Sequence, residues 1–260
     1  MLLDDFRNLT DIQWRRSKES ECGLFIAEGA TTIERAIELG YVPRSALTTS
    51  RWVDSLPLAL TQRISPTVVD DDVMQTITGY HVHRGALVSF ERKPLPTCED
   101  LISNARTVLV LEDLVDHENV GALLRSAAGM GIDAVLFSDS CADPLYRRSL
   151  KVSLGSALSI PFSRYSDSQL VIQKLRDSSF ESWALTPRGE VELLSAVVNS
   201  SLDNRKIAIF LGTEGDGLLS ETLDSCDIRV SIPMLRNTDS LNVATAGAIA
   251  MWALTQRGNF

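Results

Sequence analysis

Three segments in the second half of the chain follow apolar runs and carry polar side chains that could do chemistry. They read DHENVGALLRSAAGMG (116–131), IFLGTEGDGLLSE (209–221) and IPMLRNTDSLNVATAGAIA (232–250). Taken singly, such residues could be helix caps or solvated side chains. Together, an arginine, a glutamate and three further polar groups at successive strand ends have the composition of an active site. The candidates are Asn119, Arg125, Glu214, Ser240 and Asn242.

The loop in IFLGTEGDGLLSE raises a narrower question, because a strand, a glycine-rich turn and a helix often build a phosphate site. Gly215 and Gly217 supply the start of a dinucleotide GxGxxG motif, but Ser220 replaces its third glycine. The Gly-Lys-Ser/Thr ending of a P-loop is absent as well. Glu214 and Asp216 would repel a phosphate. These residues argue against a phosphate cradle and a nucleotide-dependent oxidoreductase, and they leave a plain structural turn open.

The elements that must position these residues form an α/β unit over about residues 105–260. TVLVLEDL, DAVLFSD, KIAIFLG and IRVSIP are short apolar runs of the kind that is buried on both faces of a parallel sheet. Helical patterns separate them, and SLNVATAGAIAMWALTQRG predicts a long final helix. Asn119 stands where a helix N-cap would be, with Arg125 about 9 Å further along. Since such sheets bind ligands beyond the carboxyl ends of their strands, we expect the three polar segments at one edge.

A first α/β unit is predicted over residues 1–93. LFIAEG (24–29) is typical of a strand, and TTIERAIELG (31–40) of a helix that ends before Gly40. SALTTS, TVVDD and GALVSFER are further strand candidates. KPLPTCED contains two prolines and breaks the pattern, so we expect a linker over 94–104.

Composition and charge exclude several classes of protein. Of the 260 residues, 44% are hydrophobic and 23% charged, as in ordinary globular proteins. No apolar run approaches the roughly 20 residues of a membrane span, and the N-terminus lacks a signal-peptide pattern, so we expect a cytoplasmic protein with no membrane contact. The net charge of −9 means that any nucleic-acid face must be local. Four scattered cysteines and an isolated His81/His83 pair predict no metal site.

The three polar segments resemble the motifs of the SpoU-type (TrmH-like) RNA ribose 2′-O-methyltransferase family of the SPOUT superfamily. NVGALLRSA, LGTEGDGL and IPM followed by SLNV occur in the family's order and spacing, within about residues 107–255. Two details depart from the pattern: Asp239 stands where a glutamate often precedes Ser-Leu-Asn, and ATAGA replaces a run that usually contains serine and valine. The first unit is similar to the family's N-terminal RNA substrate-binding domain, an L30e-like α/β module, with FIAEG as its most telling piece.

This resemblance implies a parallel-sheet domain with a deep trefoil knot over 105–260, and S-adenosylmethionine as the cofactor held in the knot. The acidic loop is then no obstacle, since this cofactor carries no phosphate, and glycines let the backbone approach it closely. The cofactor-binding residues carried over are Gly212, Thr213, Gly215, Gly217, Ile232, Pro233, Met234 and Leu241.

In the reaction that the resemblance implies, a ribose 2′-OH attacks the sulfonium methyl group in line. The five polar candidates occupy the family's catalytic positions, and Glu214 would anchor the site through hydrogen bonds. Family proposals give the base role to the arginine at the position of Arg125. A guanidinium is not deprotonated in proteins, so a phosphate clamp that orients the hydroxyl is physically easier. His117 is an alternative base, because histidines titrate near neutral pH.

The resemblance also implies an RNA substrate and a homodimer in which Arg125 of one subunit completes the site of the other. Two basic clusters are candidate RNA-binding residues, with a solvated basic face as the alternative for each: Arg15, Arg16 and Lys18, and Arg147, Arg148 and Lys151. The added N-terminal domain, without a basic extension after the last helix, favours rRNA over tRNA. An RNA-binding or ribosome-assembly factor that keeps the fold without catalysis is the alternative function.

Overall fold

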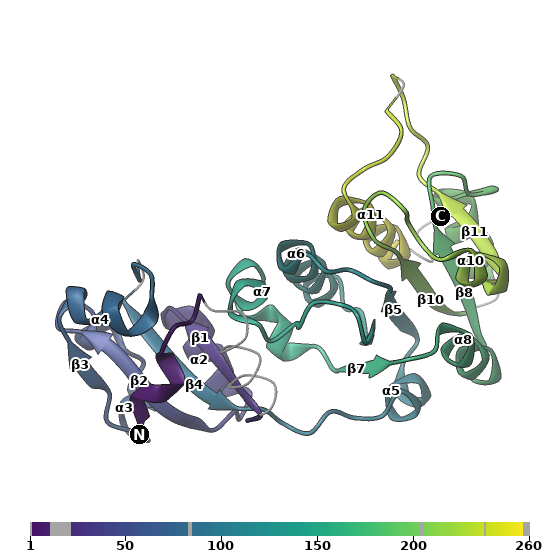
Figure 1. Cartoon of the computed structure of the whole chain (residues 1–260). Coiled ribbons are helices and arrows are strands. Elements are labelled where there is room, and N and C mark those ends of the chain that lie inside the picture. The colour runs from purple at the N-terminus through teal and green to yellow at the C-terminus, as the bar shows by residue number, and fades with distance from the viewer. Residues whose placement is uncertain (1, 11–21, 83–84, 203–204, 237, 257–260) are drawn as a thin grey trace. The chain divides into compact units, whose positions relative to one another are not determined.

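The computed structural model describes all residues except 1, 11–21, 83–84, 203–204, 237 and 257–260. Contacts divide the chain into two compact units (Figure 1). Unit 1 is Met1–Pro94 with Pro144–Ser159, and unit 2 is Leu95–Asp143 with Ile160–Phe260. Residues 144–159 therefore belong to unit 1 by their contacts, although the sequence pattern placed them in the second domain. As functional domains, the limits 1–93 and 105–260 stay a prediction.

Unit 1 is built on a four-stranded sheet in the order β1-β4-β2-β3. Its elements are η1 Leu2–Phe6, β1 Leu24–Glu28, α2 Ala30–Glu38, β2 Pro43–Thr49, η3 Val53–Ser55, α3 Leu58–Thr61, β3 Thr67–Val69, α4 Asp71–Thr78, β4 Ala86–Glu91, α7 Arg147–Val152 and η4 Ser156–Ser159. The β2–β3 pair is parallel and the other two pairs are antiparallel. Ile26, Leu47 and Leu87 pack with Met74 of α4 in one buried cluster. The predicted helix end is confirmed, since Gly40 follows α2 with a left-handed φ of 76°.

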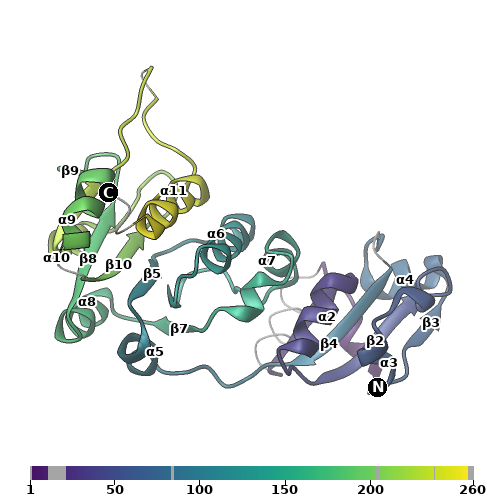
Figure 2. The same ribbon diagram turned by 180° about the vertical axis from the view of Figure 1, so that it is seen from behind.

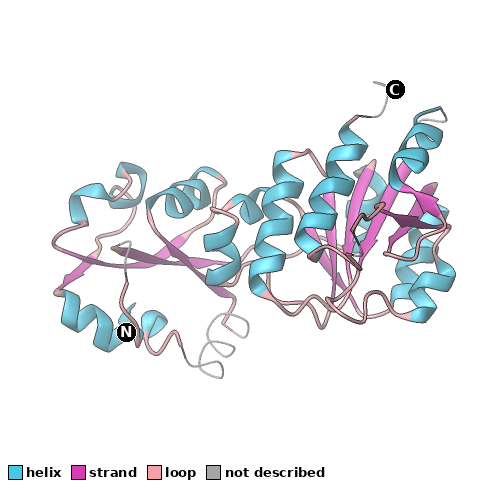
Figure 3. Ribbon diagram, turned by 90° about the horizontal axis from the view of Figure 1, so that it is seen from above, coloured by secondary structure: helices cyan, strands magenta, loops and turns pink. Residues whose placement is uncertain are grey.

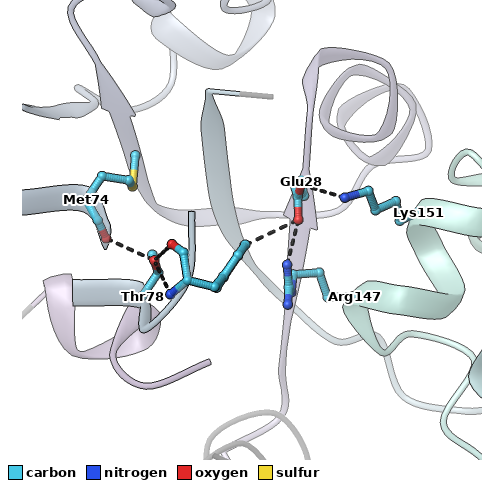
Figure 4. Close-up of polar contacts among 6 residues, drawn as sticks. Glu28, Met74, Thr78, Arg147 and Lys151 are labelled. Carbon is cyan, nitrogen blue, oxygen red and sulfur yellow. Dashed lines mark hydrogen bonds and ion pairs between the residues drawn. The ribbon is translucent and has the colours of Figure 1, made fainter. Parts of the chain in front are cut away.

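A buried carboxylate fixes α7 to the rest of unit 1 (Figure 4). The side chain of Glu28, at the end of β1, is 1% exposed and accepts hydrogen bonds from Arg147 Nη1 at 2.6 Å and Lys151 Nζ at 3.0 Å. The Arg147 guanidinium also lies 4.1 Å from the centroid of the Tyr80 ring. Burial alone would raise the pKa of Glu28, but the hydrogen bond from Lys151 and the charge of Arg147 lower it below its ordinary value. Arg147 and Lys151 therefore lie on one face of α7, and both contact Glu28.

We predict that Glu28→Ala lowers the free energy of unfolding by about 3 kcal/mol, because two cations lose a buried partner. The lowered pKa means that the carboxylate stabilises the fold above its unfolded value, near 4.5, and that this stabilisation is lost as the pH falls through the folded value. Urea unfolding at several pH values measures both effects. Glu34→Ala, at an exposed position of α2, is the control. Equal stability of the two variants at neutral pH would contradict the prediction.

Unit 2 is an α/β domain whose seven-stranded sheet runs in the order β7-β6-β5-β10-β8-β11-β9. Its elements are α5 Cys98–Asn104, β5 Thr107–Leu111, α6 His117–Gly129, β6 Ala134–Ser138, β7 Phe162–Tyr165, α8 Ser168–Asp177, β8 Phe180–Leu185, β9 Val191–Glu192, α9 Leu193–Leu202, β10 Lys206–Leu211, α10 Ser220–Ser225, β11 Ile228–Ser231 and α11 Val243–Thr255. Every pair of strands that are neighbours in the sheet is parallel, which confirms the predicted parallel sheet.

Helices cover both faces of this sheet (Figure 3). Val110 and Phe210 belong to the buried cluster that includes residues of α5 and α8. On the opposite face, Gly247 of α11 lies against Leu123 of α6 and Leu211 of β10. Since successive strand residues point to opposite faces, this explains why the central strands are continuously apolar.

Two parts of unit 2 differ from the sequence-based expectation. The segment expected as a linker contains α5, which begins because Thr97 and Asp100 form a capping box. The segment between β11 and α11 extends away from the strands as a long loop (Figures 1 and 2). No helix in the described part of the chain is long and apolar enough to span a bilayer.

Candidate functional site

The parallel sheet places the three polar segments at its carboxyl edge. α6 follows β5, the glycine loop follows β10, and α11 follows β11. Asp116, and not Asn119, is the N-cap of α6, because its carboxylate accepts hydrogen bonds from the backbone N–H groups of Glu118 and Asn119. Asn119 is thus the third residue of the helix, and its side chain is available for other contacts.

Asn119, Glu214 and Asn242 form one hydrogen-bonded cluster, which we call the amide–carboxylate cluster. Asn119 Nδ2 donates to Glu214 Oε1 at 3.1 Å. Asn242 Nδ2 donates to the same Glu214 oxygen at 2.5 Å and to Asn119 Oδ1 at 2.9 Å. Three segments that are far apart in the sequence are thereby joined at one carboxylate oxygen.

The same Asn242 side chain also starts the last helix. Its Oδ1 accepts hydrogen bonds from the backbone N–H groups of Ala244 at 2.9 Å and Thr245 at 3.3 Å, so Asn242 is the N-cap of α11. Ser240, two residues earlier, is exposed in the loop before this helix. Asn242 therefore couples the geometry of the cluster to the position of α11.

The glycine loop is a tight turn closed on itself. Gly217 N–H donates to the Thr213 carbonyl at 3.1 Å, and Gly215 and Gly217 have positive φ angles of 95° and 75°. Gly212 is needed for a different reason. A Cβ at this position would lie 2.3 Å from the backbone of Gly217 and Leu218, a distance that no side chain tolerates.

Beside this loop lies a cavity of about 560 Å³, within the size range of small-molecule sites. Its walls are mainly apolar side chains and loop backbone. The lining residues are Leu185, Thr186, Pro187, Leu211, Gly212, Thr213, Glu214, Gly215, Gly217, Ile232, Met234, Ser240, Leu241, Asn242, Val243 and Ala246. All residues predicted to bind a cofactor line it except Pro233, which is exposed between two lining residues.

Sequence reasoning missed the wall that follows β8. Leu185, Thr186 and Pro187 line the cavity, but FESWAL carries polar residues among its apolar ones and was not predicted as a strand. No group of three or more histidine, cysteine or acidic residues in the described segments could hold a metal ion.

A second anchor of the glycine loop, Glu112, was also missed. This residue directly follows β5 and is 2% exposed. Its Oε1 accepts a hydrogen bond from Leu219 N–H at 2.8 Å, and its Oε2 accepts one from Thr222 Oγ1 at 2.6 Å. The end of the loop and the start of α10 are thus tied to the strand end that leads to α6. The only signal in the sequence was a carboxylate at the end of an apolar run.

We predict that Glu112→Ala destabilises unit 2 by about 2 kcal/mol, because Leu219 N–H loses its acceptor and Thr222 Oγ1 keeps only its contact with Ser168 Oγ at 3.2 Å. Urea denaturation measures the change in the free energy of unfolding. Glu221→Ala, at an exposed position on α10, the helix that contains Thr222, is the matched control. It is expected to change the free energy of unfolding by less than about 0.5 kcal/mol. If both variants unfold at the same urea concentration, Glu112 does not anchor this loop.

Arg125 is not part of the amide–carboxylate cluster. It lies six residues after Asn119 on α6. At about 100° per residue, the two side chains therefore point about 120° apart around the helix axis. Its side chain is exposed and makes no hydrogen bond or ion pair with any residue that the structure describes. Within one chain, Asn119 and Arg125 therefore face different directions.

The two basic clusters predicted for RNA lie elsewhere. Arg15, Arg16 and Lys18 are outside the described residues. Arg147 and Lys151 contact Glu28 inside unit 1, and Arg148 is exposed. Their role in RNA binding stays a prediction.

A comparison with protein-family models identifies the family of the region that carries the candidate site. Residues 106–252, which contain all three polar segments, match the model of the SpoU rRNA Methylase family. The chain belongs to the SpoU rRNA Methylase family. The match covers most of unit 2 and begins just before β5.

Relatives in this family extend the similarity over both units. A protein of Mycobacterium tuberculosis named as an uncharacterized tRNA/rRNA methyltransferase is 40% identical over 258 residues, covering 99% of this chain and 89% of its own. The 23S rRNA (guanosine-2′-O-)-methyltransferase RlmB of Escherichia coli is 30% identical over 185 residues, covering 68% of this chain and 73% of its own.

Solved structures of SpoU-type enzymes share the fold. The AdoMet-bound rRNA methyltransferase from Sinorhizobium meliloti superposes with a TM-score of 0.81 at 22% identity, covering 98% of this chain and 94% of its own. The SpoU methyltransferase AviRb from Streptomyces viridochromogenes, in complex with AdoMet, gives a TM-score of 0.80 at 21% identity, covering 98% and 97%. The α/β architecture with a large parallel sheet is therefore that of SpoU methyltransferases.

Proposed function

We propose that this RNA methyltransferase of the SpoU family transfers a methyl group from S-adenosylmethionine to a ribose 2′-OH, with rRNA as the substrate class. The observation that carries the proposal is the amide–carboxylate cluster at the rim of a glycine-lined cavity. The RlmB relative, whose name specifies guanosine 2′-O-methylation of 23S rRNA, supports the ribose and the rRNA.

The cofactor is S-adenosylmethionine, which is bound in two methyltransferase structures of the same fold. The cavity fits its chemistry. Leu185, Ile232 and Met234 offer apolar surface to a purine ring, and the glycine loop offers bare backbone. No described lining residue is a lysine or arginine, as expected for a ligand without phosphate. The carboxylate of Glu214 is compatible with a positively charged sulfonium.

When bound, S-adenosylmethionine supplies an electrophilic methyl group on a sulfonium centre. The protein must then orient the 2′-OH and accommodate the loss of its proton. Glu214 fixes the glycine loop through its bonds to Asn119 and Asn242. Ser240 and Asn242 line the cavity on the opposite segment and would position the nucleotide. Arg125 would hold a substrate phosphate and orient the hydroxyl, with the proton leaving to water.

We further propose the trefoil knot and the homodimer. In support of the knot, the segment after β8 crosses β11: Thr186 N–H donates to the Val230 carbonyl, and a Cβ on Gly189 would lie 2.4 Å from the backbone of Val230. In support of the dimer, Arg125 faces away from the amide–carboxylate cluster of its own chain. A second subunit would bring its arginine to that cluster.

We predict that Arg125→Ala lowers methyl transfer at least about 100-fold, the order of effect expected when a positioned charge is removed from an active site. Its affinity for S-adenosylmethionine should stay within about two-fold of wild type, because Arg125 does not line the cavity. Transfer of labelled methyl groups to total RNA from cells that lack the protein measures the first, and calorimetry the second. Full activity of the variant on this RNA would remove the role given to Arg125. A wild-type protein that binds RNA without transfer would instead favour the inactive assembly factor.

We predict that Gly212→Ala raises the dissociation constant of S-adenosylmethionine at least about ten-fold. The new Cβ must displace the backbone of Gly217 and Leu218, 2.3 Å away, and so reshapes one wall of the cavity. Gly129→Ala is the control, since a Cβ there meets nothing within 4 Å. Equal affinities of the two variants in calorimetry would separate the glycine loop from the cofactor site.

A further inference from the structure

The mouth of the cavity poses an electrostatic problem for an RNA substrate. The reacting 2′-OH of any internal nucleotide lies next to its own 3′-phosphate, so RNA must bring negative charge to the site. Glu214 lines the cavity, and Asp216 and Asp239 are exposed in the two loops that carry lining residues. These carboxylates repel phosphate unless cations offset them. Arg125 of the same chain faces away from the amide–carboxylate cluster, and the single arginine that a second subunit would bring there can hold one phosphate, so the neighbouring phosphates need further cations.

Two arginines occupy the loops that form the mouth. Arg188 directly follows the lining residues Thr186 and Pro187, and Arg236 lies two residues after the lining residue Met234. The two loops are neighbours, because a Cβ on Gly189 would contact the backbone of Val230, at the end of β11. Both arginines are thus held near one cavity by residues that line it.

Both side chains are exposed, and neither makes a hydrogen bond or ion pair with any described residue. Other arginines of unit 2 are engaged: Arg205 pairs with Glu181, and Arg229 with Asp224. The guanidinium donors of Arg188 and Arg236 are therefore available to a bound anion. Their planar forks match the oxygen geometry of a phosphate.

The backbone at Arg236 adds an independent observation. Its φ of 57° lies in the left-handed region, which is uncommon for a residue other than glycine. The preceding Leu235 is 81% exposed, so little buried surface compensates for this conformation. The loop that contains them extends away from the strands (Figures 1 and 2). A strained and exposed arginine in a projecting loop is typical of a residue kept for a binding partner.

We propose that Arg188 and Arg236 bind phosphates of the substrate RNA at the mouth of the cavity, on either side of the reacting nucleotide in the sequence of the RNA. This role of Arg188 and Arg236 rests on the proposed function in one respect only, namely that the reacting group is a ribose 2′-OH. Phosphate contacts of this kind position the RNA and carry no base specificity.

The test uses the full-length protein with Arg188→Ala, Arg236→Ala and the double variant. The matched control is Arg176→Ala: this arginine is half-exposed at the end of α8, which leads into the amino end of β8, so it lies at the sheet edge opposite the cavity. The probe is an unmodified transcript of 23S rRNA, with binding measured over a series of KCl concentrations. Calorimetry with S-adenosylmethionine reports on the cavity itself.

Each single variant should raise the dissociation constant of the transcript about ten-fold and reduce the slope of its logarithm against the logarithm of salt by about 0.7–0.9, as for one lost phosphate contact. Arg236→Lys should keep the slope, since it keeps the charge. Cofactor affinity should stay within about two-fold of wild type. Variants that bind RNA like Arg176→Ala, or that lose cofactor affinity equally, would overturn the assignment. Absence of methyl transfer by the wild type would overturn the proposed function alone, because the binding measurements do not depend on turnover.

Discussion

A single carboxylate oxygen, Glu214 Oε1, holds the candidate site together. It accepts hydrogen bonds from Asn119 and Asn242, which are 95 and 28 residues away in the sequence. The parallel sheet makes this possible, because β5, β10 and β11 end at the same edge, and the loops that follow them lie there together. Asn242 donates to Glu214 through Nδ2 and caps α11 through Oδ1, so the same side chain positions the last helix. The cavity is the space that these connections leave between the loops.

The charges of the site are arranged in layers. The residues that line the cavity are apolar, neutral polar or acidic, which suits a cofactor with a positive sulfonium and no phosphate. Buried Glu112 accepts hydrogen bonds from Leu219 N–H and Thr222 Oγ1 and so anchors the C-terminal end of the glycine loop. Cations appear only further out, on exposed loops and on α6. An acidic protein can therefore act on RNA, provided that the cations lie where the phosphates pass.

The sequence predicted β5, β6, β10 and β11, because strands buried on both faces are continuously apolar and leave a clear pattern. It missed β7, β8 and β9. In β8, Glu181 accepts a hydrogen bond from Trp183 Nε1 and so places a polar residue in a buried strand. It also placed the cap of α6 at Asn119, which is wrong: Asp116 is the cap, and both residue types cap helices whose starts are uncertain by a few residues.

Long-range contacts explain the remaining differences. The motif residues around Glu214 were recognisable as a set, but only the fold shows that Asn119 and Asn242 share one oxygen and that Arg125 points elsewhere. Residues 144–159 belong to unit 1 because buried Glu28 binds Arg147 and Lys151, a contact between residues more than 100 positions apart that no local pattern records. Glu28 itself looked like the polar end of a strand.

The most direct test of the central claim is a map of 2′-O-methylated riboses in total RNA from cells with and without this protein. The account predicts that at least one site in rRNA loses its methyl group in the deletion strain, and that the wild-type gene restores it. A gene that encodes Asn242→Ala should not restore it, since this change removes one hydrogen bond to Glu214 and the cap of α11. Identical maps in the presence and absence of the protein would contradict the account.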